Sequence, residues 1–196
     1  MTSAEDTFTR HGGTLRMSEA LRLGLTRREL YGLRDRGLIE CVSRGVYRLT
    51  ALPLISRPDL VTVGLRCPGA VVCLTSALAF HELTTQVPHA VSIAIPRSAR
   101  APTIDFPTVD VHRFSSAAYE SGIETHIIDG VPVKVYCPAK TLADCFKFRN
   151  RVGMDVVLEA LKLLGARDDA KVGELLRFAA VCRVEKVMRP YLEVTF

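Results

Sequence analysis

The stretch TRRELYGLRDRGLIECVSRGVYRLT, residues 26–50, decides the fold of the N-terminal part of the chain. Thr26 is predicted to cap a helix that runs on to Gly37. The segments LIECV and VYRLT then alternate between inward and outward residues, and SRG supplies a hairpin turn in which Gly45 takes the positive φ. A helix followed directly by a hairpin is typical of the recognition helix and wing of a winged helix.

The residues before this stretch complete a helix-turn-helix. A first helix is predicted over 4–11, and the segment 14–17 is short enough to pair as a strand with the later hairpin. Ser18 is predicted to cap a second helix that ends at Gly24. Two capped helices separated by a very short turn have the spacing of a helix-turn-helix. Leu30 and Leu33, three positions apart, are predicted to face inward.

Charge is concentrated in this N-terminal segment. Residues 1–50 hold nine arginines, no lysine and six acidic residues, and so carry +3 of the chain's net +5. The arginine guanidinium is suited to forked contacts with phosphates and guanine edges. Charge alone does not distinguish a nucleic-acid surface from an ordinary solvated one.

The helix and the hairpin together predict a set of DNA-binding residues. Side chains near the N-terminus of a recognition helix reach base edges in the major groove, and arginines on a wing contact phosphates. The predicted residues are Thr26, Arg27, Arg28, Tyr31 and Arg34 on the helix, and Arg44 and Arg48 on the wing. The alternative is a winged helix used only for protein contacts.

Composition places the protein in a broad class. The chain has 196 residues, of which 48% are apolar and 24% charged, as in a soluble globular protein. It has no run of 18 apolar residues, and its polar start lacks the apolar core of a secretory signal. We therefore expect a cytoplasmic protein without a membrane partner. Its six cysteines form no CxxC pair, so we expect reduced thiols and neither a metal nor another cofactor.

The remainder of the chain predicts a second domain. Residues 51–58 have the composition of a connector. Four segments alternate like strands, over 91–96, 108–114, 124–129 and 131–136, and Asp129-Gly130 joins the last two as a two-residue hairpin. Pro138 is predicted to start a helix, and helical patterns follow over 153–164, 171–181 and 184–193.

The predicted fold class is therefore α+β, with an N-terminal winged helix-turn-helix and a mixed α/β domain that has a helical C-terminal third. The predicted domains are a DNA-binding domain at 1–51 and a second domain at 58–196.

No familiar catalytic motif is present, so we expect no enzyme activity and no catalytic residue. Asp110 and His112 lie on one face of a predicted strand, but no nucleophile or third partner accompanies them. Lys140, Asp144 and Lys147 fall on one helical face. They fit either a phosphate site at the helix start or, as we favour, an exposed helix with ion pairs between residues four apart.

These motifs resemble a known family. The segment GGTLRMSEALRLGLTRRELYGLRDRGLIECVSRGVYRL, residues 12–49, resembles the N-terminal winged helix of AbiEi-type antitoxins from type IV toxin–antitoxin systems. The segments VSIAIPRSAR, 91–100, and VPVKVYCPAKTLADCFKFRNRVGMDVVLEALK, 131–162, resemble the antitoxin domain of that family.

The resemblance implies a cytoplasmic repressor of its own toxin–antitoxin operon. The companion protein is then a nucleotidyltransferase-like toxin, which such antitoxins counteract without a stable complex, so direct contact is not assumed. The DNA-contacting role carries over to Thr26, Arg27, Arg28 and Tyr31 on the helix and to Arg44 on the wing. This sequence departs from the expected pattern at Gly32, where another polar or basic side chain is expected.

The leading hypothesis is a DNA-binding autorepressor and antitoxin, two copies of which read repeated half-sites in its own promoter, with a homodimer on DNA as the corresponding assembly. One alternative is a one-component regulator whose second domain senses a small molecule. Another is a nucleic-acid enzyme delivered by the winged helix. Against the enzyme stands the lack of a metal-binding carboxylate pair, since the five-residue separation of Asp105 and Asp110 would not place both on one strand face.

Overall fold

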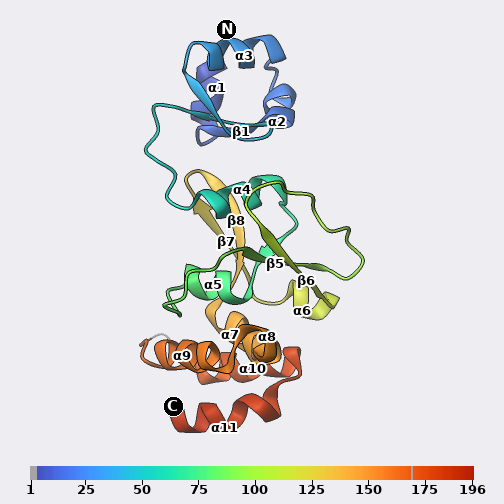
Figure 1. Cartoon of the computed structure of the whole chain (residues 1–196), viewed down its shortest axis with the longest axis vertical. Coiled ribbons are helices and arrows are strands. Elements are labelled where there is room, and N and C mark those ends of the chain that lie inside the picture. Colours follow the sequence, from blue (N-terminus) through green and yellow to red (C-terminus); the bar gives the residue numbers. More distant parts are fainter. Residues whose placement is uncertain (1–3, 169) are drawn as a thin grey trace. The chain divides into compact units, whose positions relative to one another are not determined.

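A computed structural model describes residues 4–168 and 170–196 (Figure 1). The fold is α+β, as predicted. The chain forms two compact units. The first contains the residues up to Pro68 together with 126–133, and the second contains 69–125 and 134–196. The predicted domain ranges 1–51 and 58–196 stay a prediction.

The first unit contains the winged helix. Its elements are α1 (Ala4–Arg10), β1 (Thr14–Arg16), α2 (Met17–Arg22), α3 (Arg27–Asp35), β2 (Ile39–Ser43), β3 (Val46–Leu49) and α4 (Pro58–Arg66). The strands form an antiparallel sheet in the order β1-β3-β2, so the segment before the helix-turn-helix does pair with the hairpin. Gly45, with φ of 73°, forms the turn as predicted.

The start of α2 differs from the prediction. The helix begins at Met17, and Arg16 rather than Ser18 occupies the N-cap position, without a side-chain cap. The reason is that β1 ends at Arg16 and the chain passes directly from strand to helix. The N–H of Met17 donates to the carbonyl of Gly45 over 2.8 Å, so the wing satisfies one of the first N–H groups of the helix, which have no partner within the helix.

A small apolar core positions the helices and the wing of this unit. Leu30 and Leu33 of α3 are buried, as predicted from their spacing. The buried cluster also takes residues from α1, α2, the turn between α2 and α3, and all three strands: Phe8, Leu15, Ala20, Leu25, Ile39, Tyr47 and Leu49. Because α3 and the sheet share this cluster, the recognition helix and the wing are held as one body.

The second unit is built on a mixed five-stranded sheet. Its first elements are β4 (Val71–Val72), α5 (Leu74–Phe80), β5 (Val91–Pro96), β6 (Val109–Phe114), α6 (Ser116–Glu120), β7 (Ile123–Ile128) and β8 (Val131–Tyr136). The hairpin end of β7 and β8, residues 126–133, is counted with the first unit. The order is β6-β5-β4-β8-β7, with β5 parallel to β6 and antiparallel to β4. Asp129 and Gly130 both have positive φ, which confirms the predicted two-residue hairpin.

The C-terminal third is helical, as predicted. It contains α7 (Pro138–Lys147), α8 (Arg149–Val152), α9 (Met154–Gly165), α10 (Val172–Cys182) and α11 (Glu185–Thr195) (Figure 1). Pro138 is the first residue of α7, where its missing N–H has no helical partner to lose. The short helices α6 and α8 were not predicted, because each spans only about one turn and has too few residues to show a period.

The face of α7 that carries Lys140 and Asp144 is buried, which corrects the favoured sequence interpretation. Both residues are fully buried, and only Lys147 is exposed. The ion pair between residues four apart does form, with 2.5 Å between Lys140 Nζ and Asp144 Oδ2. The Lys140 ammonium also lies 4.2 Å from the ring centroid of Tyr136. The face is therefore part of the core, and neither a solvent-exposed surface nor an open phosphate site.

Two further observations concern the chain as a whole. All six cysteines are free thiols, as predicted. None of the helices in the part of the chain that the structure describes has both the length and the apolar character required to span a bilayer.

Candidate nucleic-acid interface

The N-terminus of α3 is fixed by a reciprocal capping box. The Thr26 hydroxyl accepts from the N–H of Glu29 over 3.2 Å, and Glu29 Oε2 accepts from the N–H of Thr26 over 2.7 Å. These bonds lower the pKa of Glu29 below its ordinary value, so its carboxylate stays charged near the positive end of the helix. The Thr26 hydroxyl also donates to Glu29 Oε2, so its hydrogen-bonding capacity is already used within the helix.

The exposed face of α3 begins with two arginines. Arg27 and Arg28 are exposed, and their guanidinium groups make no hydrogen bond or ion pair with the residues that the structure describes. Tyr31 follows one turn after Arg27 and is 39% exposed. The first turn and a half of the helix thus presents two unpaired cations and a phenol, which is a suitable arrangement for contacts to base edges and phosphates.

Arg34 is further along α3 and is already partnered. Its Nη2 lies 2.9 Å from Asp35 Oδ1, and its guanidinium lies 5.0 Å from the centroid of the Tyr31 ring. The hydrogen bond and the charge of Asp35 raise the pKa of Arg34 further, so it is always a cation. Because Asp35 offsets this charge locally, Arg34 attracts a phosphate less strongly than Arg27 or Arg28.

The departure at Gly32 leaves space on this helix. A Cβ placed on Gly32 meets no other atom within 4 Å. The exposed face of α3 is therefore open between Arg28 and Arg36, and the glycine is not required there by packing. The carbonyl of Gly32 accepts a hydrogen bond from Arg36 Nε over 3.1 Å.

The wing places its two predicted arginines in different environments. Arg44 lies at the hairpin tip and is exposed. The side chain of Arg48 is only 4% exposed, and it donates to the carbonyls of Leu52 and Pro53. It also lies 3.6 Å from Glu40. Contrary to the sequence interpretation, Arg48 ties the wing to the chain that follows it and does not present its guanidinium to solvent.

A hollow of about 370 Å³ lies where the wing meets the two helices of the helix-turn-helix. Four arginines and no acidic residue line it: Arg16, Arg27, Arg44 and Arg66. Arg66 donates to the carbonyl of Arg44 over 2.8 Å. Sequence reasoning missed Arg16 and Arg66, because neither lies on the recognition helix or the hairpin. A concave surface whose charged residues are all cationic favours the binding of phosphate oxygens.

A metal-dependent nuclease requires a cluster of metal-binding side chains. Within 4–168 and 170–196, no group of three or more His, Cys, Asp or Glu residues is arranged to hold a metal ion. Asp110 lies on β6, whereas Asp105 lies in the loop before it.

This geometry defines the class of the first unit as a winged helix-turn-helix. Residues 4–50 match the sequence model of a family described as transcriptional regulator, AbiEi antitoxin, which confirms the resemblance for this segment. The family match supports, in general terms, a DNA-binding antitoxin and transcriptional regulator.

One solved structure extends the likeness to the whole fold. The RV2827C protein from Mycobacterium tuberculosis is 12% identical and superposes with a TM-score of 0.53, over 97% of this chain and 80% of that one. At that identity the likeness concerns the fold alone. Comparison with curated proteins gave no match.

Proposed function

We propose that this protein is a cytoplasmic autorepressor and antitoxin of a type IV toxin–antitoxin system, and that it counteracts a nucleotidyltransferase-like toxin. The observation that supports this proposal most directly is that Arg27 and Arg28 are exposed, and unpaired among the described residues, at the capped start of α3. Both lie within the segment that matches the AbiEi regulator family. The proposal gives the protein no catalytic activity of its own.

In the proposed mechanism the start of α3 enters the major groove. Arg28 and Tyr31 then face base edges, while Arg27 and Arg44 approach the phosphates that border the groove. Thr26 acts by capping the helix, so its role is to orient the arginines. Two copies of the chain bind repeated half-sites in the promoter, as expected for a homodimer on DNA.

The experiment is fluorescence anisotropy of the purified protein with the DNA upstream of its own gene. A scrambled duplex of the same composition is measured beside it, and both are titrated at about 50 and 200 mM salt, the range over which phosphate-dominated binding weakens strongly. We expect the native duplex to retain an advantage at the higher salt. If both duplexes bound equally and both were released as salt rises, the arginines would provide only a general affinity for polyanions. That result would contradict autoregulation.

A second candidate function is a one-component regulator whose second unit senses a small molecule. It is favoured by a cavity of about 590 Å³ in that unit, lined by His112 and Arg151. Release from operator DNA on addition of a ligand of that cavity distinguishes this candidate from a plain autorepressor.

A further inference from the structure

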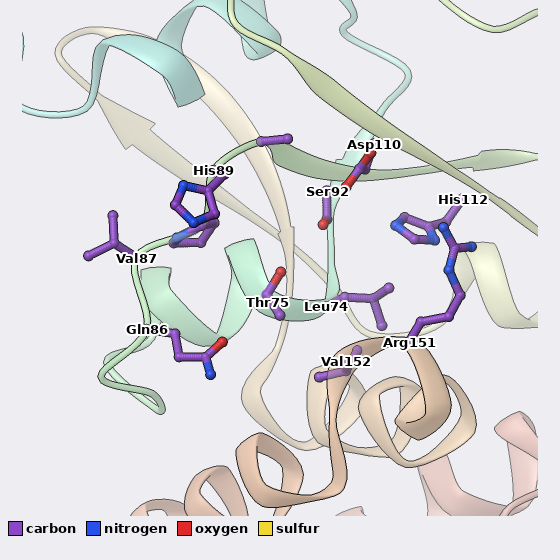
Figure 2. A pocket seen from close by; sticks show the side chains of 12 residues that line it. Leu74, Thr75, Gln86, Val87, His89, Ser92, Asp110, His112, Arg151 and Val152 are labelled. Carbon is purple, nitrogen blue, oxygen red and sulfur yellow. The ribbon is translucent and has the colours of Figure 1, made fainter.

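The second unit contains a cavity that the DNA-binding proposal does not use. Its volume is about 590 Å³, within the range of small-molecule sites. It is formed where β5 and β6 meet α5, α8 and the loop before β5. In Figure 2, Thr75 and Ser92 project into the space between these elements, and Leu74 and Val152 supply an apolar floor.

The most informative residue in this cavity is His112. It is 6% exposed, and both of its ring nitrogens are buried without a hydrogen-bond partner among the described residues. Buried polar atoms are normally paired, because a buried donor or acceptor without a hydrogen bond destabilises the fold. The ring is held in place by an edge contact to Phe148, with 5.6 Å between the ring centroids. The imidazole therefore lies at the cavity wall with a hydrogen-bonding capacity that the described residues leave unused.

Charged groups of both signs flank the imidazole. Arg151 of α8 and Asp110 of β6 line the same cavity, and Figure 2 shows the Arg151 guanidinium directed toward the His112 ring. Burial, reinforced by the charge of Arg151, lowers the pKa of His112, while Asp110 opposes that shift. The ring is therefore neutral near pH 7, with one N–H donor and one acceptor nitrogen. Among these three groups, Arg151 is the permanent cation.

We propose that this cavity binds a small organic anion. A carboxylate or phosphate group of the ligand is held by the Arg151 guanidinium and the His112 N–H, and a neighbouring hydroxyl or amino group donates to Asp110. Arginine is suited to both anionic groups because its fork matches their paired oxygens. The apolar floor at Leu74 and Val152 accommodates the carbon skeleton.

The experiment follows the imidazole directly. The full chain is labelled with ¹⁵N-histidine, and the five histidine rings are observed by NMR during separate titrations with inorganic phosphate and with glycolate, the smallest 2-hydroxy carboxylate. We expect a saturable shift of the His112 signals, half complete at a concentration on the order of millimolar, as suits so few ligand atoms. The two titrations show which anionic group is preferred. Sodium chloride at the same ionic strength should not move the signals.

A matched pair of variants makes the result decisive. Arg151→Ala removes an exposed side chain, and we expect it to weaken the response of His112 about tenfold or more. Arg189→Ala removes an arginine of α11 that is paired with Glu185, and should leave the response unchanged. Thermal melting checks that both variants fold. Absence of a saturable His112 shift with both probes, or an unchanged response in Arg151→Ala, would overturn the proposal.

Discussion

Thr26 and Arg28 are two residues apart, yet their side chains have different roles in the structure. The hydroxyl of Thr26 is bonded to Glu29 on both its donor and its acceptor side, so it stabilises the helix start. Arg28 is exposed and lies in the first turn of α3, where side chains of a recognition helix meet base edges. Both side chains are exposed, so their hydrogen bonds and not their exposure separate the residue that caps the helix from the residue that is free to contact DNA in the proposed mechanism.

Arg28→Ala should cost about 1–3 kcal/mol of binding free energy on the native operator and relax the preference at one base position. The physical reason is that a bidentate guanidinium distinguishes guanine from other bases, whereas a methyl group does not. Anisotropy titrations against operators with single base changes measure this effect. Arg10→Ala, which removes an exposed arginine from α1, is the control and should retain the parental pattern.

Arg44→Ala should weaken binding to native and scrambled DNA by the same factor. The tip of the wing carries a charge for phosphates, and one lost phosphate contact reduces the slope of log K against log salt by about 1. The measurement is a salt series with each duplex. If the variant lost preference for the native duplex while keeping its salt slope, Arg44 would be reading bases.

The two wing arginines also show where sequence reasoning stops at this scale. Residues Leu30, Leu33 and Gly45 were predictable because spacing and turn chemistry are local. The burial of Arg48 was not, because it depends on pairing across the sheet. Strand β3 is central, so Arg48 lies between Thr14 and Glu40 and is covered by the chain at 52–53. In an isolated hairpin the side chain of Arg48 would be open to solvent. Here β1 pairs beside β3, and the chain at 52–53 covers the side chain.

Helix α7 also carries charged side chains whose burial the local sequence does not predict. A Lys and an Asp four residues apart predict an ion pair equally well on a surface helix and on a buried one. In the structure both side chains are fully buried, and Asp144 Oδ1 also accepts from the Cys182 thiol over 3.1 Å. Burial raises the pKa of Asp144, and the Lys140 ammonium opposes that rise. The sequence predicted the pair, and tertiary packing decided its environment.

Lys140→Met should therefore destabilise the fold by about 3–5 kcal/mol, because it leaves the Asp144 carboxylate buried without its counter-charge. Urea unfolding measures the change. Lys147→Met is the matched control on the same helix, and we expect it to lie within about 0.5 kcal/mol of the parent because that side chain is exposed.

A double variant tests the explanation of this effect. Lys140→Met combined with Asp144→Leu removes both charges, and it should recover part of the lost stability, since an apolar pair of similar volume can replace a buried ion pair. If the double variant were less stable than Lys140→Met alone, Asp144 would be contributing through its bond to Cys182 and not as the partner of Lys140.

At the scale of the molecule, the order of elements was more predictable than their arrangement. The winged helix, the Asp129-Gly130 hairpin and the helical third all follow from periods and turn residues. The strand order β6-β5-β4-β8-β7 does not, because β4 has only two residues and joins partners that are far apart in sequence. The cavity around His112 likewise brings together α5, β6 and α8, and sequence offered only Asp110 and His112 as neighbours on one strand.

The division into two compact units suggests that repression and toxin neutralisation can be separated by mutation. The double variant Arg28→Ala with Arg44→Ala removes two exposed side chains from the first unit and leaves the second unit unchanged. We expect it to lose repression of a reporter driven by its own promoter. It should still restore growth when it is expressed with the toxin from a neutral promoter, because in the proposed function the neutralisation of the toxin does not require binding to DNA. Matched protein levels and the Arg10→Ala control distinguish lost binding from lost folding. If the double variant failed to restore growth while remaining folded, DNA binding and antitoxin action would share the winged helix, and the proposed division of labour would be wrong.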